Sequence, residues 1–175
     1  MDKKTIFLDR DGVVNKEVNY LRKIKDFKFI NGVFDSCTYF LELGYEIIII
    51  TNQSGIAKGY LSENDFDNIT KWMFNQFKDN NINILDVLYC PHNAESNCEC
   101  RKPKPGMLLQ AKNKHNINMQ TSWMIGDKES DIKAANAAGI DNTILVRSGH
   151  KVDQISTNAK FFLSSIKEAT QVITS

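Results

Sequence analysis

The chain has 175 residues, which is enough for one domain with its own hydrophobic core. Hydrophobic residues make up 42% of it and charged residues 25%, and the net charge of +1 gives no case for a nucleic-acid or membrane surface. The first apolar run is too short for a signal peptide, and no segment approaches the roughly 20 apolar residues of a membrane span. We therefore expect a cytoplasmic protein, acting as a monomer, that recognises its partner at a local site.

The first third of the chain alternates between strand and helix patterns. Residues 6–8 form a short apolar run typical of a buried strand, and the polar segment 15–29 has no clean period and is expected to form a flap. Asn31 is expected to cap a helix that runs to Leu43. The almost unbroken apolar run 45–50 predicts a strand that is covered on both faces.

The same alternation continues to the end of the chain. Ser62 is expected to cap a helix whose apolar side chains recur every three and four residues and face the core. Pro105 suits the first position of a later helix. The remaining predicted elements are strands over 84–89, 122–125, 142–146 and 160–163, and helices over 105–115, 132–138 and from Ile166 onward. This order predicts an α/β protein with a parallel sheet.

The first predicted strand ends in two acids, Asp9 and Asp11, followed by Gly12. Side chains two residues apart on a strand point to the same side, and ligands of open α/β sheets bind at the carboxyl ends of the strands. One acid can act as nucleophile or metal ligand, and the other as general acid and base. From this segment alone, a polar Asp-Gly turn with no chemical role is an equally good interpretation.

Other predicted strand ends supply Thr51 and Asn52, then Arg101 and Lys102, then Asp127. Three carboxylates placed together would repel one another unless a cation lay among them, and oxygen-only ligands suit Mg²⁺. Together with that ion, Lys102 and Arg101 would form a positively charged binding site for a phosphate. Thr51 and Asn52 could donate hydrogen bonds to the phosphate oxygens. Together these residues indicate phosphoryl transfer through an aspartyl-phosphate.

A second cluster consists of Cys90, His92, Cys98 and Cys100. Three thiols and one imidazole are a complete tetrahedral set for structural Zn²⁺, and in a reducing compartment such clustering favours a metal over disulfides. Four protein ligands would fill the tetrahedral coordination of the zinc and leave no site for a substrate or water. We therefore expect this zinc to order the loop at about 90–100 without a catalytic role. The remaining cysteine, Cys37, falls on the apolar face of a predicted helix, where packing explains it.

Four motifs follow one another along the chain: DRDGV at 9–13, TNQSGI at 51–56, RKP at 101–103 and GDKESD at 126–131. In this order they resemble those of the haloacid dehalogenase (HAD) superfamily of phosphatases, and the resemblance covers nearly the whole chain. It implies a three-layer, doubly wound parallel sheet in a single domain over 1–175, without a separate cap domain.

The resemblance also implies a role for each matching residue. Asp9 would be the nucleophile, and Asp11 would protonate the leaving alkoxide and then deprotonate the hydrolytic water. Thr51 and Lys102 would stabilise the phosphoryl group. Mg²⁺ would be held by Asp9, by Asp11 through its main-chain carbonyl, and by Asp127.

Substrate contacts follow from the same resemblance. Asp131 is expected to orient other groups and not to bind the metal, and Lys128 is either a substrate contact or an ordinary surface lysine. The implied substrate-binding residues are Glu17, Val18, Asn19, Tyr20, Thr51, Asn52, Gln53, Ser54, Arg101, Lys102 and Lys128.

Within the superfamily, the motifs are similar to the sugar phosphatases that act on heptose bisphosphates during the synthesis of nucleotide-activated heptose. Histidinol-phosphate phosphatases share the zinc loop, and the short spacing of five residues between His92 and Cys98 is a feature of their kind. A receiver-type phospho-acceptor domain is the alternative from another class. It fits less well, because receivers carry their acceptor acid after the third strand, and here that strand enters the cysteine loop.

Overall fold

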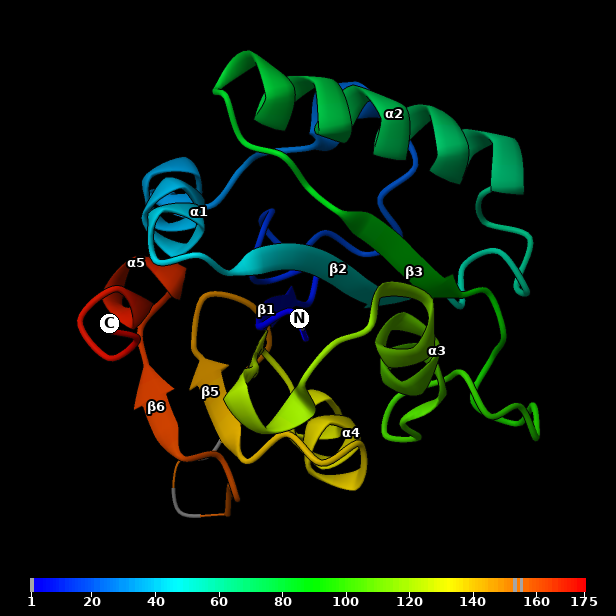
Figure 1. Ribbon diagram of the computed structural model, residues 1–175. Coiled ribbons are helices and arrows are strands. Elements are labelled where there is room, and N and C mark those ends of the chain that lie inside the picture. The colour runs from blue at the N-terminus through cyan, green and yellow to red at the C-terminus, as the bar shows by residue number, and fades with distance from the viewer. Residues whose placement is uncertain (1, 153, 155) are drawn as a thin grey trace.

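The computed structural model describes residues 2–152, 154 and 156–175. Its strands form one parallel sheet in the order β3-β2-β1-β4-β5-β6 (Figure 1). In this doubly wound order the chain moves outward from β1 in one direction and from β4 in the other, so the switch point lies between β1 and β4. The strands are β1 (Thr5–Leu8), β2 (Glu46–Asn52), β3 (Asp86–Cys90), β4 (Trp123–Gly126), β5 (Asn142–Val146) and β6 (Phe161–Leu163).

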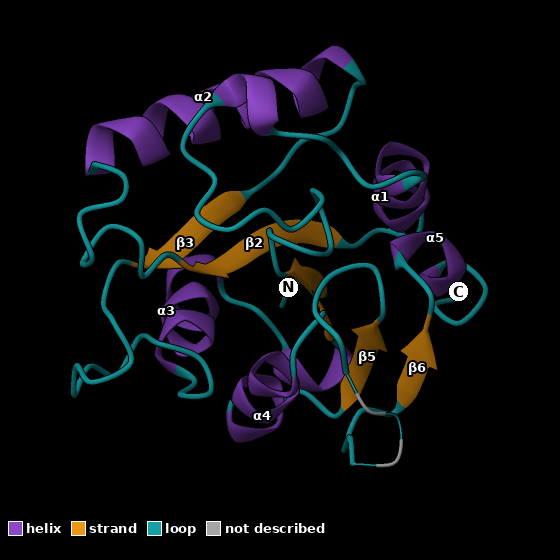
Figure 2. Cartoon of the chain, turned by 180° about the vertical axis from the view of Figure 1, so that it is seen from behind, coloured by secondary structure: helices purple, strands orange, loops and turns teal. Residues whose placement is uncertain are grey.

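Helices cover both faces of the sheet, which confirms the predicted three-layer fold. α1, α2 and α5 pack against one face, and α3 and α4 against the other (Figures 1 and 2). The helices are α1 (Val33–Glu42), α2 (Glu63–Asp79), α3 (Gly106–His115), α4 (Glu129–Ala137) and α5 (Ile166–Ala169), with 3₁₀ helices η1 (Ile24–Asp26) and η2 (Met119–Thr121). In the described ranges, none of these helices has the length and apolarity needed to cross a membrane.

The core confirms the prediction that β2 is covered on both faces. Ile47 and Ile49 pack with α1, α2 and α5, whereas Ile48 and Ile50 pack with α3 and α4. All four side chains are fully buried. Each such burial stabilises the fold by roughly 1.5–3 kcal/mol, so this strand anchors the sheet on which the polar strand ends are mounted.

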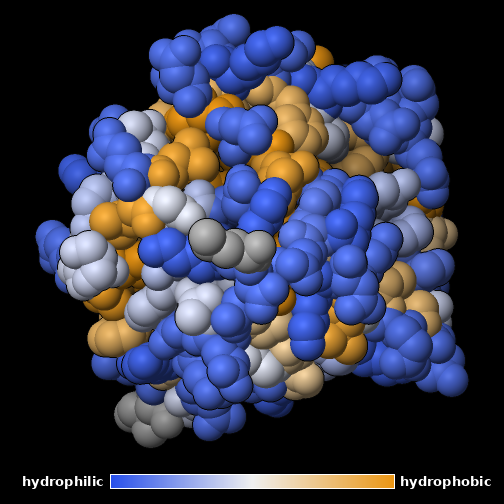
Figure 3. All heavy atoms as spheres, viewed as in Figure 1, coloured by the Kyte–Doolittle hydropathy of each residue, from blue (hydrophilic) through white to orange (hydrophobic). Residues whose placement is uncertain are grey.

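The longest helix, α2, begins where the sequence predicts. The Ser62 hydroxyl accepts a hydrogen bond from the Asp65 amide at 3.0 Å, and the Asp65 carboxylate accepts one from the Ser62 amide at 2.8 Å. This reciprocal capping box satisfies two otherwise unpaired donors. Hydrophilic side chains cover the outer face of α2 in Figure 3. Its buried stripe is Phe66, Ile69, Met73 and Phe77, as expected.

Two predicted helix starts are wrong. α1 is capped by Gly32 and not by Asn31, because Gly32 has a φ of 85° in the left-handed region that glycine adopts readily. α4 begins at Glu129 and not at residue 132, because the Asp131 carboxylate accepts a hydrogen bond from the Lys128 amide at 3.0 Å and so caps the first turn.

Smaller shifts of one or two residues occur at several other elements. The expected strands 6–8, 45–50, 122–125 and 160–163 are observed as β1 (Thr5–Leu8), β2 (Glu46–Asn52), β4 (Trp123–Gly126) and β6 (Phe161–Leu163). Pro105 is the residue before α3 and not its first helical residue. β3 pairs with β2 over Asp86–Cys90 and not over 84–89, with Cys90 opposite Asn52. This register places the start of the cysteine loop directly beside the end of β2.

The segment 15–29 forms the predicted flap. Its two ends are joined, since the Lys16 amide donates to the Lys28 carbonyl at 2.8 Å and the Ile30 amide donates to the Val14 carbonyl at 2.9 Å. The middle of the segment is therefore held as a closed loop, and residues 17–21 border the pocket at the end of β1.

Candidate active site

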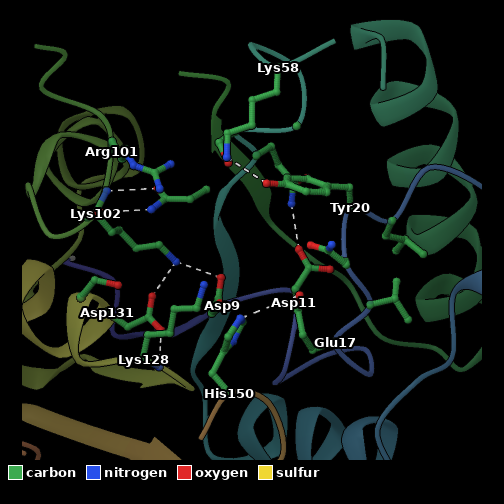
Figure 4. A pocket seen from close by; sticks show the side chains of 18 residues that line it. Asp9, Asp11, Glu17, Tyr20, Lys58, Arg101, Lys102, Lys128, Asp131 and His150 are labelled. Atoms are coloured by element: carbon green, nitrogen blue, oxygen red, sulfur yellow. Dashed lines mark hydrogen bonds and ion pairs between the residues drawn. The ribbon is translucent and has the colours of Figure 1, made fainter. Parts of the chain in front are cut away.

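One pocket of about 330 Å³ lies at the carboxyl edge of the sheet (Figure 4). It is formed by the ends of β1 and β2, the flap, the segment after the cysteine loop, the start of α4 and the loop after β5. Most of the predicted site residues line it: Asp9, Asp11, Glu17, Val18, Asn19, Tyr20, Asn52, Gln53, Ser54, Arg101, Lys102 and Lys128. Thr51 and Asp127 lie beneath its surface and are buried.

Lys102 is the central cation of the pocket. Its Nζ lies 2.9 Å from Asp9 Oδ1 and 2.7 Å from Asp131 Oδ1, and it donates a hydrogen bond to the Ile50 carbonyl at 2.7 Å. Burial opposes the charge, but Asp131 and Asp9 outweigh it and raise the pKa of Lys102. The lysine is therefore permanently charged and fixed beside Asp9, where a phosphoryl group attacked by Asp9 would lie.

Asn52 holds Lys102 in place. Its side-chain Nδ2 donates to the Lys102 carbonyl at 3.1 Å, and its Oδ1 accepts from the Lys102 amide at 3.1 Å. Both ends of the Asn52 amide are thus used on the main chain of Lys102. Asn52 therefore positions Lys102, and the phosphate contact expected from the sequence stays a prediction for its second amide hydrogen.

Three carboxylates, those of Asp9, Asp127 and Asp131, meet at the end of β1, with ligand atoms within 4.8 Å of one another. Asp127 is fully buried, and its Oδ1 has no hydrogen-bond partner among the described residues. Burial and the neighbouring Asp127, partly offset by Lys102, raise the pKa of Asp9 to about 7. An unpartnered buried oxygen among crowded acids fits a hard divalent cation such as Mg²⁺.

Asp131 is already engaged by other groups. Its Oδ1 pairs with Lys102, and its Oδ2 accepts from the amides of Asp127 at 3.1 Å and Lys128 at 3.0 Å. Its carboxylate therefore joins the cationic lysine to the segment that carries Asp127. This arrangement suits an orienting residue better than a metal ligand.

Asp11 points toward a different set of partners. Arg10 donates to its carboxylate from Nη2 at 3.0 Å, and Asn15 and Gln53 donate at 3.0 and 2.9 Å. Burial alone would raise the pKa of Asp11, but Arg10 and these hydrogen bonds outweigh it and lower the pKa. Gln53 also donates to the Thr51 hydroxyl at 2.8 Å, so it couples Thr51 to Asp11.

His150 is a site residue that the sequence did not predict. Its amide and its Nδ1 contact Asp127 Oδ2 at 2.9 and 2.6 Å, and its Nε2 lies 3.9 Å from Glu17. The loop after β5 comes this close because Gly12 and Gly149 leave space, and a Cβ at either position would collide with Asp127. A signal for this residue in the sequence is the stretch VRSG at 146–149, which directly precedes it.

Two more ionisable side chains, those of Glu17 and Lys58, line the pocket. Burial and the nearby Asp11 raise the pKa of Glu17 to about 7. Lys58, from the turn that follows β2, also lines the pocket and was not predicted.

The four residues of the predicted zinc cluster lie together in the loop after β3. The closest approaches are 2.9 Å between the sulfurs of Cys100 and Cys90 and 3.2 Å between His92 Nδ1 and the Cys100 sulfur. All four ligand atoms, that of Cys98 included, lie within 4.8 Å of one another, and all four cysteines of the chain are free thiols. This donor set fits Zn²⁺. Cys37 is fully buried in the core, as expected.

Comparisons with known proteins identify relatives of this chain. A family profile described as HAD-hydrolase-like matches residues 99–169. The chain is 47% identical over 163 residues to the D-glycero-alpha-D-manno-heptose-1,7-bisphosphate 7-phosphatase of Photorhabdus laumondii, and the match covers 89% of both chains. It is 44% identical to the corresponding beta-heptose enzyme of Vibrio cholerae, over 96% of this chain and 95% of the relative.

Solved structures show the same fold. The D,D-heptose 1,7-bisphosphate phosphatase from B. bronchiseptica, complexed with magnesium and phosphate, matches with a TM-score of 0.85 at 24% identity and covers 97% of each chain. A putative HAD-like phosphatase from Mesorhizobium loti matches with a TM-score of 0.85 at 26% identity, over 98% of this chain and 85% of that one. Because the sequence relatives match over nearly their full length, the chain belongs to the haloacid dehalogenase superfamily, in the family of heptose-1,7-bisphosphate 7-phosphatases, which are phosphoric monoester hydrolases.

Proposed function

We propose that this protein, as a single phosphatase domain, removes the C7 phosphate of D-glycero-D-manno-heptose 1,7-bisphosphate with the help of Mg²⁺. The reaction would serve the synthesis of nucleotide-activated heptose. The observation that carries the proposal is the buried cluster of Asp9, Lys102 and Asp127 at the carboxyl edge, in a chain 39–47% identical to enzymes named for this reaction. The cluster joins an acid that can attack phosphorus to a fixed cation that can hold the phosphoryl oxygens.

In the proposed reaction, the Asp9 carboxylate attacks phosphorus and forms an aspartyl-phosphate. Lys102 stabilises the charge on the phosphoryl oxygens, and Thr51 donates to them. Asp9, Asp127 and the main-chain carbonyl of Asp11 would hold Mg²⁺, which when bound supplies positive charge against the acids and the phosphoryl group. Without such charge, an anionic nucleophile and an anionic phosphate would repel each other.

Asp11 would transfer the protons. It donates one to the leaving sugar oxygen, and it then takes one from the water that hydrolyses the aspartyl-phosphate. Its lowered pKa suits the second step. For the first step it must be protonated, and the negative charge of an incoming phosphate raises a neighbouring carboxyl pKa in the required direction.

The test is phosphate release with and without Mg²⁺ from heptose 1,7-bisphosphate, histidinol phosphate and simple sugar monophosphates. We expect the highest kcat/KM for the heptose bisphosphate and loss of nearly all turnover in Asp9→Asn. Asp35→Asn, which changes an exposed acid on α1, is the matched control and should behave as wild type. A preference for histidinol phosphate would refute the substrate assignment, and an active Asp9→Asn variant would refute the nucleophile.

We also propose one structural Zn²⁺ per chain, bound by Cys90, His92, Cys98 and Cys100. Arg101 and Lys102 follow the last ligand directly, so the metal would fix the segment that delivers both cations to the pocket. Thiols that must stay reduced to bind zinc suit a reducing compartment, and we propose that the protein acts in the cytoplasm. Elemental analysis of protein purified without added metal should find one zinc, and none in a double Cys98→Ser, Cys100→Ser variant. A wild-type preparation without zinc would contradict this assignment.

A further inference from the structure

Lys58 stands on a rigid turn between β2 and α2. The Lys58 amide donates to the Ser54 carbonyl at 3.1 Å, the Gly59 amide to Ile56 at 3.0 Å and the Tyr60 amide to Gly55 at 2.8 Å. These bonds fold the segment back on itself directly after the strand end that carries Thr51. The backbone of Lys58 is therefore held in place although its side chain is exposed.

The side chain of Lys58 is directed by Tyr20 of the flap. Its Nζ donates to the Tyr20 hydroxyl at 2.9 Å and lies 5.4 Å from the centre of the Tyr20 ring. Tyr20 is itself constrained, because its backbone is left-handed with a φ of 57° and its ring packs 4.6 Å from that of Tyr60. A Cβ at Gly55 would come within 2.8 Å of the same ring, so the fit on that side is tight.

Lys58 forms no close ion pair among the described residues, and Glu95 acts on its charge only from a longer distance. In the part of the chain that the structure describes, no carboxylate lies within 4.0 Å of its Nζ, whereas Lys102 pairs with two carboxylates and Lys104 with Glu99. The hydrogen bond with Tyr20 raises the pKa of Lys58, so the amine is charged at neutral pH. A charged, directed and unpaired ammonium in a substrate pocket is available to an anion.

The position of Lys58 separates it from the reacting phosphate. Lys58 and Tyr20 lie across the pocket from Lys102 and Asp131 (Figure 4). The phosphate that Asp9 attacks must lie at the Lys102 side, since Asp9 and Lys102 are in direct contact. An anion bound by Lys58 is therefore a second anionic group of the same substrate.

We infer that Lys58, directed by Tyr20, binds the phosphate of a bisphosphorylated sugar that does not react. This inference rests on the proposed function and names how the pocket selects its substrate. An unpaired ammonium attracts a second phosphate and repels the amine of an amino-alcohol phosphate such as histidinol phosphate. The same residue thus favours a bisphosphate and disfavours the cationic alternative.

The test compares kcat/KM for heptose 1,7-bisphosphate with that for heptose 7-phosphate, which lacks the second phosphate. In wild type we expect a preference for the bisphosphate, and in Lys58→Met we expect that preference to fall by about tenfold or more, mainly through KM. Lys58→Arg should keep most of the preference, and Tyr20→Phe should lose part of it because the lysine loses its hydrogen-bond acceptor. Lys71→Met, an exposed lysine of α2 that does not line the pocket, is the matched control.

Each outcome decides the matter. If Lys58→Met lowers kcat/KM equally for the two substrates, Lys58 only supports the loop and the inference is wrong. If wild type shows no preference for the bisphosphate, the inference is wrong while the phosphatase assignment stands. If wild type releases phosphate from neither sugar in the presence of Mg²⁺, the proposed function itself fails and the inference fails with it.

Discussion

Replacement of Lys102 by methionine should damage both stability and turnover. Methionine has a similar volume but no charge, so Asp9 and Asp131 would remain buried without the cation that now lies 2.9 and 2.7 Å from them. The Ile50 carbonyl would also lose a hydrogen bond of 2.7 Å. Removing one partner of a buried ion pair costs about 3–5 kcal/mol, because the remaining charge has no compensation.

This cost can be measured by thermal unfolding in buffer without Mg²⁺ and without a chelator, so that any zinc remains bound. For a chain of this size, the loss corresponds to a fall in Tm of about 6–20 °C. The loss should be smaller at pH 5.5 than at pH 8. The pKa of Asp9 is already raised to about 7, and without Lys102 it would rise further, so protonation at low pH relieves the buried charge.

The kinetic prediction is a fall in kcat of about a hundredfold or more, as for loss of a group that stabilises transition-state charge. Lys104→Met is the matched control: it also removes an ion-paired lysine, but the side chain of that lysine is exposed and, among the described residues, pairs only with Glu99, at 2.9 Å. It should lower the stability by less than about 1 kcal/mol. If Lys102→Met unfolds within 1 °C of wild type and the control does the same, the buried network does not carry the energy assigned to it.

Three further predictions concern other parts of the fold. Ser62→Ala removes one half of the capping box and should lower the stability by about 1 kcal/mol, measured by urea unfolding. Asp86→Asn breaks contacts to His115 at 2.7 Å and Lys114 at 2.8 Å. Burial would raise the Asp86 pKa, but these partners lower it below 3.8, so its contribution is present above that pH and is lost as the pH falls through the lowered pKa. Wild type and variant should therefore differ in stability at pH 7, and the difference should shrink as the pH falls through the lowered pKa of Asp86. A difference that stays constant as the pH falls would contradict the assignment. Removing zinc with a strong chelator should raise KM several-fold, whereas amide exchange in β2 and β1 should change little. If amide exchange in these strands becomes much faster as well, the metal stabilises the whole fold.

The sequence predicted the residues to which we assign the chemistry better than it predicted the residues that position them. Asp9, Lys102 and Asp127 could be found because parallel strands end at a common edge, which makes strand-end residues neighbours whatever the intervening chain does. Asn52 was found too, but its hydrogen bonds to the main chain of Lys102 were not predicted. An amide beside a phosphate site looks like a phosphate donor, and only coordinates reveal that both of its ends bond the main chain of Lys102.

Two pocket residues were missed for a related reason. His150 and Lys58 follow strand ends by several residues, and the position of each depends on a tight backbone path. His150 reaches Asp127 because Gly12 and Gly149 leave no side chains between the loops. Lys58 is directed by a tyrosine 38 residues earlier in the chain. Periodicity and strand order do not encode such contacts.

At the starts of α1 and α4, neighbouring residues compete to cap the helix. Asn31 is a good capping residue by type, yet the next residue, Gly32, takes the left-handed conformation and becomes the cap. α4 begins three residues earlier than expected because the Asp131 carboxylate accepts a hydrogen bond from the amide of Lys128. The same carboxylate also pairs with Lys102, so the residue that caps this helix also holds the lysine of the pocket in place.

A common physical pattern connects these observations. Each chemical group at the edge is held by a partner from another segment: Lys102 by Asn52, Asp11 by Gln53, and Lys58 by Tyr20. These partners are polar and contribute little to the hydrophobic core, so their exchange should change catalysis more than folding. Lys102 differs from these partners because it is buried between two acids, so its replacement should lower both the catalytic rate and the stability of the fold. The ratio of the two effects, measured for Asn52→Ala against Lys102→Met, would separate a residue that positions the site from one on which the fold also depends.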